Sequence, residues 1–299
     1  MEWGPYLEFI HLNYQKVENL FPINFNRHLK LLRLKKCTTE ILGPKYRPNH
    51  YNIVLDITYD CNLKCFNCNR SCGLAPSDNH MSIKQIKKFI KESNERDRKW
   101  ESIILAGGEP TLNPHILRIV DLLLQYTKNT SPDTKLVIVT NGYGDKPKSV
   151  LLSVPDEVEI WNTGKKSRVQ KDFVNFNIAP CDYLSSKNID YSNGCWVTGA
   201  CGIGLTDFGY YFCAIAGGID RVFGFDIGRK KMPASGDMMK EQSRILCKYC
   251  GHFARESISD RFQIFGYSKE TVNGQENISP TWTGVYKKYR RRRPSISSY

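Results

Sequence analysis

The sequence predicts an α/β protein in which parallel strands alternate with helices, followed by a smaller cysteine-rich region. Two observations carry this prediction. Between residues 51 and 178, short apolar runs alternate with amphipathic segments, which is the pattern of parallel strands joined by crossover helices. After Pro180, cysteines, glycines and aromatic residues replace that pattern, and we place a domain boundary there.

The composition of the whole chain is that of a globular protein. The chain has 299 residues, 40% of them hydrophobic, and a formal net charge of +13. No apolar stretch approaches the roughly 20 residues that span a bilayer. The N-terminus lacks the basic start and apolar segment of a signal peptide. We therefore expect a cytoplasmic protein, and for its eleven cysteines we favour metal binding over a disulfide framework.

The first 50 residues are expected to form an N-terminal extension without a chemical motif. Within it, the segment Arg27–Lys36 has the spacing of a basic amphipathic helix, for which core packing is the ordinary explanation. Cys37 stands apart from the other cysteines and is expected to be an ordinary thiol.

The strand and helix signals begin at residue 51. Ser82 and Gln85 form a capping-box pattern at the start of the first crossover helix. Asn113 and Pro114 predict the start of the second crossover helix, as its N-cap and first residue. A short third helix is expected near residues 147–153. The strands are predicted at residues 52–58, 102–106, 136–140, 157–161 and 173–178.

Three cysteines with the spacing C-x3-C-x2-C follow the first predicted strand. Cys61, Cys65 and Cys68 lie on one loop. Three thiolates at this spacing can hold three corners of an iron–sulfur cube, which leaves the fourth iron open for another ligand.

This loop resembles the cluster-binding loop of the radical S-adenosylmethionine (radical SAM) superfamily. In that family SAM chelates the open iron and is cleaved to a 5′-deoxyadenosyl radical. The family usually has an aromatic residue immediately before the third cysteine. Here that residue is Asn67, and the aromatic Phe66 is one place earlier.

Two more motifs follow at the ends of the next strands. Gly107-Gly108-Glu109-Pro110 looks like the GGEP element of the family, which binds the amino group of SAM. Thr140-Asn141-Gly142 is similar to its TNG element, which faces the ribose and carboxylate, although an Asn-Gly turn is the ordinary alternative. Over residues 51–180 the resemblance implies a partial (β/α)6 barrel. Cys72 would close the fourth iron if it were a ligand, but the GGEP element has no purpose without SAM, so we expect a spare thiol.

A second group of cysteines lies in residues 181–260. Cys247 and Cys250 form a C-x2-C pair, which can bind one metal ion or cluster. With Cys195 and Cys213 they resemble the auxiliary-cluster domains called SPASM and twitch. The resemblance implies a second [4Fe–4S] cluster bound by these four cysteines. A zinc site and buried structural cysteines are the alternatives.

The sequence does not decide the roles of several residues in the C-terminal half. Cys201 could replace Cys195 as a ligand, be structural, or donate a hydrogen atom to a substrate radical. Cys181 fits no motif. Residues 261–299 are expected to be an extension whose basic run, including Arg290–Arg293, is a solvated, mobile tail; binding of an acidic partner, a membrane surface or nucleic acid is the alternative.

The resemblance implies an enzyme that cleaves SAM reductively and abstracts a hydrogen atom from its substrate. We expect dehydrogenation or epimerisation of a small polar metabolite or natural-product intermediate, with a reductant such as flavodoxin or ferredoxin as partner. A peptide maturase that epimerises or cross-links a ribosomal peptide is the alternative. A non-catalytic metal-binding nucleic-acid protein is the alternative of another class, although nucleic-acid binding is not expected.

Overall fold

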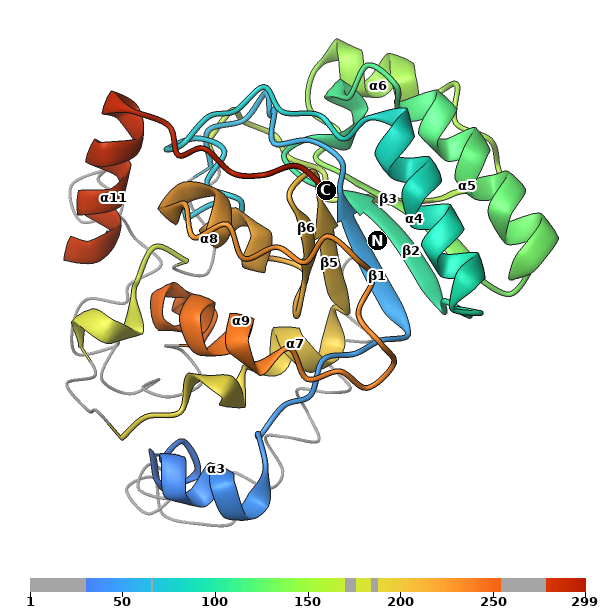
Figure 1. The fold of residues 1–299 in the computed structure, drawn as a ribbon. Coiled ribbons are helices and arrows are strands. Elements are labelled where there is room, and N and C mark those ends of the chain that lie inside the picture. Colours follow the sequence, from blue (N-terminus) through green and yellow to red (C-terminus); the bar gives the residue numbers. More distant parts are fainter. Residues whose placement is uncertain (1–30, 66, 170–175, 184–187, 254–277) are drawn as a thin grey trace, which may run out of the picture.

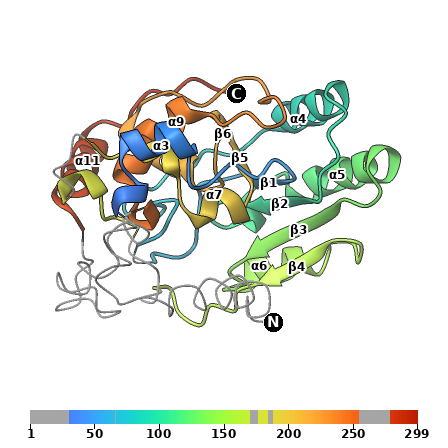
Figure 2. The same ribbon diagram turned by 90° about the horizontal axis from the view of Figure 1, so that it is seen from below.

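The computed structural model describes residues 31–65, 67–169, 176–183, 188–253 and 278–299. Its centre is one six-stranded sheet with the strand order β4-β3-β2-β1-β5-β6. Figure 2 shows the strands in this order across the molecule. The α/β class, the mainly parallel character of the sheet and the presence of a cysteine-rich C-terminal region are thereby confirmed.

The four strands on one side of the sheet run parallel and follow the chain in order. They are β1 (Asn52–Asp56), β2 (Ser102–Ala106), β3 (Lys135–Thr140) and β4 (Glu159–Asn162). The crossover helices between them are α4 (Ile83–Glu95), α5 (Ile116–Thr130) and α6 (Asp145–Leu151). Figure 1 shows α4 and α5 side by side on one side of the sheet. Successive side chains of a strand point to opposite faces of the sheet. Ile53 and Leu55, two residues apart, therefore share the face that these helices cover, and both are fully buried.

The start of α4 follows the predicted capping box. The Ser82 hydroxyl accepts a hydrogen bond from the Gln85 backbone N–H at 3.3 Å, and the Gln85 side chain accepts one from the Ser82 N–H at 2.8 Å. Two backbone donors that the first helical turn leaves free are satisfied in this way.

The start of α5 differs from the prediction. The helix begins at Ile116, and Asn113 instead ends the short helix η1 (Pro110–Leu112). The Asn113 side chain donates to the backbone oxygens of Ile57 and Met81, at 2.8 and 3.2 Å. This polar side chain therefore ties the turn after β2 to the segment after β1. Its oxygen also accepts the His115 N–H at 2.8 Å, which is the local bond expected of a capping Asn.

The fifth strand comes from a later part of the chain than predicted. Residues 176–178 are irregular, and residues 173–175 of the predicted strand lie outside the described residues. In its place β5 (Ile203–Thr206) pairs with β1 in parallel, and β6 (Gly209–Tyr211) pairs with β5 in antiparallel. Residues beyond the expected boundary at 180 thus share the sheet of the first part.

The remaining helices lie on the other side of the sheet or at its ends. Figure 1 shows α8, α9 and α11 across the sheet from α4 and α5. None of the helices in the described ranges has the length and apolar character needed to cross a bilayer. The elements are α3 (Lys36–Leu42), η2 (Pro180–Asp182), η3 (Tyr191–Asn193), α7 (Trp196–Ala200), α8 (Ala216–Phe223), α9 (Lys240–Leu246), η4 (Cys247–Tyr249) and α11 (Pro280–Arg291).

The predicted amphipathic helix at residues 27–36 is tested only in part, because residues 27–30 lie outside the described residues. Residues 31–33 are helical, and α3 begins at Lys36. The C-terminal basic run is not a free tail, because it belongs to α11 and the segment after it. That segment ends on Tyr299, which is buried and donates its backbone N–H to the Asp207 oxygen at 2.8 Å.

Candidate metal centres and the strand-end loops

The three sequence motifs meet at one edge of the sheet. β1, β2 and β3 are parallel neighbours, so their carboxyl ends lie together. The loop that carries Cys61, Cys65 and Cys68 follows β1, Gly107–Pro110 follows β2, and Asn141 and Gly142 follow β3.

The two glycines of the second motif allow two stretches of backbone to touch. Gly107 has φ +133°, and a Cβ on it would lie 2.2 Å from the Thr58 oxygen. A Cβ on Gly108 would lie 2.2 Å from the Asp60 oxygen. The Gly108 and Glu109 N–H groups donate to these same oxygens at 2.8 Å. The turn after β2 therefore binds directly to the residues that precede Cys61.

Glu109 joins the second motif to the third. Its side chain is fully buried. One carboxylate oxygen accepts hydrogen bonds from the Thr111 and Thr140 hydroxyls, at 2.7 and 2.8 Å, and the other accepts the Asn141 N–H at 2.8 Å. The carboxylate is thus occupied by the protein, and binding of the SAM amino group by the motif stays a prediction.

Asn62 joins the cysteine loop to the third motif. Its side-chain oxygen accepts from the Asn141 side chain at 2.8 Å, and its side-chain nitrogen donates to the Tyr143 oxygen at 2.6 Å. Gly142 has φ +64°, and a Cβ there would lie 2.4 Å from the Asn162 side-chain oxygen. The loops after β1 and β3 therefore hold each other in place, and Gly142 lies close against the end of β4.

The cysteine loop places its thiols in different surroundings. Cys65 is buried, and Cys61 and Cys68 are half-buried. Burial raises the pKa of the Cys61 thiol to about 12. A hydrogen bond from the Cys72 thiol lowers the pKa of Cys68 to about 6. Cys72 also packs against Tyr59 beside Cys61 and Cys68, so it lies directly behind the predicted ligands.

Arg70 connects this loop to the second cysteine group. Its guanidinium donates to both oxygens of the buried Asp56 carboxylate at 3.0–3.2 Å, and reaches the Ala214 oxygen, next to Cys213, at 3.5 Å. Burial opposes its charge, but the Asp56 carboxylate outweighs that effect and raises the pKa of Arg70. Arg221 on α8 donates to the Arg70 backbone oxygen at 2.8 Å.

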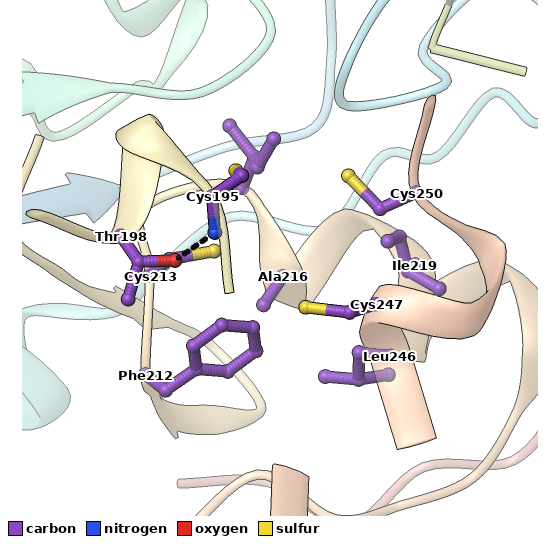
Figure 3. A pocket seen from close by; sticks show the side chains of 10 residues that line it. Cys195, Thr198, Phe212, Cys213, Ala216, Ile219, Leu246, Cys247 and Cys250 are labelled. Carbon is purple, nitrogen blue, oxygen red and sulfur yellow. Dashed lines mark hydrogen bonds between the residues drawn. The ribbon is translucent and has the colours of Figure 1, made fainter. Parts of the chain in front are cut away.

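The four cysteines predicted as ligands of a second cluster line one cavity (Figure 3). Cys195 precedes α7, Cys213 lies between β6 and α8, and Cys247 and Cys250 follow α9. All four are buried, and none forms a disulfide. Its other lining residues are mostly apolar: Thr198, Phe212, Ile215, Ala216, Ile219 and Leu246.

Burial controls the ionisation of these thiols. It raises the pKa of Cys213 to about 12 and that of Cys250 to about 11. Four uncharged thiols around an apolar cavity would become thiolates only where a positively charged metal group offsets the cost of burying the charge. The donor set therefore fits a metal group in this cavity.

A single ion and a cluster place different demands on the spacing of these donors. Within the described part of the chain, no three His, Cys, Asp or Glu side chains come close enough together to hold one metal ion. A zinc ion needs its four ligands within about 2.3 Å. An iron–sulfur cube binds each thiolate at a different iron, so its ligands lie farther apart.

Cys201 and Cys181 lie outside this cavity. Cys201 is half-buried and packs against Val54, Ala106 and Ala214, on the face of the sheet away from α4 and α5. Cys181 is exposed in η2. Of the two thiols weighed as the fourth ligand, Cys195 is the one that lines the cavity.

No sequence motif predicts several of the residues that build the site. Asn62, Asp56, Arg70 and Arg221 act through contacts between segments that are far apart in the sequence. The only available signal was the position of Asp56 at the end of an otherwise apolar strand, where a carboxylate needs a partner.

Residues 55–161 match the family model described as the Radical SAM superfamily. Among curated proteins, the chain is 32% identical over 131 residues to one from Methanocaldococcus jannaschii named for glycyl-radical enzyme activation, covering 42% of this chain and 47% of that one. It is 24% identical over 216 residues to the GTP 3′,8-cyclase of Mannheimia succiniciproducens, covering 71% and 52%. The chain thus spans about half the length of these curated relatives.

Among solved structures, the chain is similar to BtrN in complex with AdoMet and 2-DOIA. The TM-score is 0.39 and the sequence identity 16%, over 73% of this chain and 86% of that chain.

Proposed function

We propose that the protein is a radical SAM enzyme, because residues 55–161 match the model of the Radical SAM superfamily. Cys61, Cys65 and Cys68 would hold a [4Fe–4S] cluster whose open iron binds SAM. When bound, cluster and SAM supply a one-electron reductive cleavage that yields a hydrogen-abstracting radical.

The observation that carries this proposal is the joining of three loops at one sheet edge. Glu109 ties the loop after β2 to the loop after β3, and Asn62 ties the cysteine loop to the latter. Gly107 and Gly108 bring backbone against the residues before Cys61. A ligand on the open iron would meet preorganised backbone groups from these loops.

A second cluster in the cavity lined by Cys195, Cys213, Cys247 and Cys250 extends this proposal. We favour dehydrogenation or epimerisation of a small polar metabolite as the reaction. In dehydrogenation the second cluster would take an electron from the substrate radical, and in epimerisation a thiol would return a hydrogen atom. Modification of a ribosomal peptide is the runner-up.

Cys201 is the candidate thiol for epimerisation. Its position against Val54 and Ala106 puts it on the sheet face that carries Asp56 at the carboxyl end of β1. Being half-buried and outside the cavity of the four cysteines, it is available for a role other than ligation.

The test of the proposed function is SAM cleavage under anaerobic conditions. Protein reconstituted with iron and sulfide, reduced with dithionite and given SAM should form 5′-deoxyadenosine. Cys68→Ala should lose it, and Cys37→Ala, at an exposed cysteine outside both groups, should keep it. Absence of 5′-deoxyadenosine, with one zinc per chain and tight nucleic-acid binding, would support a non-catalytic protein instead.

The role of Cys201 as a hydrogen-atom donor is tested by running the reaction in deuterated water. If Cys201 donates the hydrogen atom, Cys201→Ala should still cleave SAM but should no longer incorporate solvent deuterium into the product. Deuterium incorporation that survives the substitution would exclude this role.

A further inference from the structure

A cluster of exposed positive side chains lies at the end of α11. Six basic residues occur within the seven positions 287–293, against a net charge of +13 for the whole chain. All six are exposed. Of the six, only Arg293 has an ion-pair partner among the described residues, the Asp78 carboxylate at 3.3 Å. We call this surface the basic end of α11: Lys287, Lys288, Arg290, Arg291, Arg292 and Arg293.

The opposite face of α11 packs on the cysteine loop. The Tyr286 hydroxyl lies 2.8 Å from the Ser71 hydroxyl, three residues after Cys68. The Tyr289 hydroxyl donates to the Pro76 oxygen at 3.3 Å. Both tyrosines are buried. The basic end is therefore the outer side of a helix whose inner side touches the loop of the proposed first cluster.

The segment after α11 brings the contact closer to the thiols. Ile296 packs on the buried group of Tyr59, Cys72 and Phe208, against which Cys61 also packs. Arg221 donates to the Ala75 oxygen at 2.7 Å and to the Tyr289 hydroxyl at 2.9 Å, so it fastens α11, α8 and the cysteine loop together. These contacts fix the charged surface relative to the cluster loop.

We propose that the basic end of α11 is the docking surface for an acidic one-electron carrier protein that reduces the first cluster. This inference rests on the proposed function, which requires an external electron. In the transfer, the reduced carrier loses one electron and the oxidised cluster gains it, and no atoms move. Electron transfer between proteins weakens steeply with distance. A positive surface on the helix that packs against the cluster loop therefore holds an acidic donor near that loop.

Charge complementarity identifies this class of partner. A surface of one sign steers a partner of the opposite sign and raises its association rate by about 10- to 1,000-fold at low salt. Nucleic acid or an anionic membrane would also be attracted by the charge, but neither supplies an electron to the loop beneath. An acidic electron carrier therefore explains both the positive charge of the basic end of α11 and its position beside the cysteine loop.

The variant that tests this surface replaces Lys287, Arg290 and Arg291 by Gln. Glutamine is a good helix former, so α11 should persist while three charges are removed. The matched control replaces three exposed lysines of α4, Lys84→Gln, Lys87→Gln and Lys91→Gln. Figures 1 and 2 both show α4 and α11 on opposite sides of the molecule.

Reconstituted wild type and both variants are compared with two reductants, dithionite and an acidic flavodoxin in its hydroquinone form. We expect the α11 variant to cleave SAM at the wild-type rate with dithionite and at least about 10-fold more slowly with flavodoxin at low salt. The control variant should match wild type with both reductants. The wild-type rate with flavodoxin should fall steeply between about 0.05 and 0.5 M salt.

Direct binding separates a failure of this inference from a failure of the proposed function. If wild type does not cleave SAM even with dithionite, the proposed function fails, and binding of flavodoxin to the reconstituted protein still tests the surface. Equal flavodoxin affinity in wild type and the α11 variant would overturn the docking site, as would an equal flavodoxin-driven rate. An oligonucleotide that binds the basic end without affecting either flavodoxin binding or the flavodoxin-driven rate would also overturn it.

Discussion

At the scale of single residues, Glu109 shows how a motif residue can act on the protein rather than on a ligand. Its carboxylate accepts hydrogen bonds from Thr111 in its own turn and from Asn141 after β3, and it has no contact with solvent. Removal of a buried acceptor leaves its donors unsatisfied, at a cost of about 1–3 kcal/mol.

Glu109→Gln should therefore lower the free energy of unfolding by about 1–3 kcal/mol and weaken SAM binding. The amide nitrogen of glutamine would face a donor, either the Thr140 hydroxyl or the Asn141 N–H. Denaturant unfolding and equilibrium SAM binding measure the two effects. Glu101→Gln, at an exposed glutamate before β2, is the control. Weaker SAM binding with unchanged stability would instead indicate that Glu109 acts directly on SAM.

Asp207 gives the fold a dependence on pH. Burial raises its pKa from 3.8 to about 6, although the Asn79 side chain donates to it at 2.9 Å. A carboxyl group whose pKa is raised in the folded state stabilises the fold at low pH, and this stabilisation is lost as the pH rises through about 6.

Asp207→Asn removes this titration. Relative to wild type, the variant should gain roughly 1–2 kcal/mol in free energy of unfolding between about pH 5 and about pH 8. Chemical denaturation at the two pH values measures the gain. A difference between variant and wild type that is the same at both pH values would contradict the assignment.

At the scale of the elements, some glycines are required because the fold has no room for a side chain, whereas others could be replaced. A Cβ at Gly108 would collide with the Asp60 backbone, whereas a Cβ at Gly284 in α11 meets nothing within 4 Å. Gly108→Ala should therefore destabilise the protein by about 2 kcal/mol or more. Gly284→Ala should stabilise it by about 0.5–1 kcal/mol, because glycine is a poor helix former. Thermal unfolding distinguishes the two signs, and equal shifts would contradict this difference.

Local patterns predicted the elements where local rules decide the structure. The runs that became β1, β2 and β3 were found because buried parallel strands are continuously apolar, and the start of α4 because Ser82 caps it. The start of α5 was predicted two residues early, although the Asn113 side chain does accept the local His115 N–H. β5 was missed because its pairing with β1 joins residues about 150 positions apart, which no local pattern encodes.

At the scale of the whole molecule, the sequence predicted which cysteines come together but not how the two groups are connected. Spacing and resemblance selected the four cysteines that line one cavity. The bridge of Asp56, Arg70 and Arg221 was not predictable, because it depends on α8 packing on the cysteine loop. The packing of α11 on that loop was not predictable for the same reason.

The central proposal is that the two cysteine groups hold separate clusters and that only the first cleaves SAM. It is tested most directly by measuring iron and 5′-deoxyadenosine in two reconstituted variants. With Cys61, Cys65 and Cys68 changed to Ala, we expect about four irons per chain and no 5′-deoxyadenosine. With Cys213, Cys247 and Cys250 changed to Ala, we expect about four irons and continued 5′-deoxyadenosine formation. Formation by the first variant, or its loss in the second, would contradict the proposal.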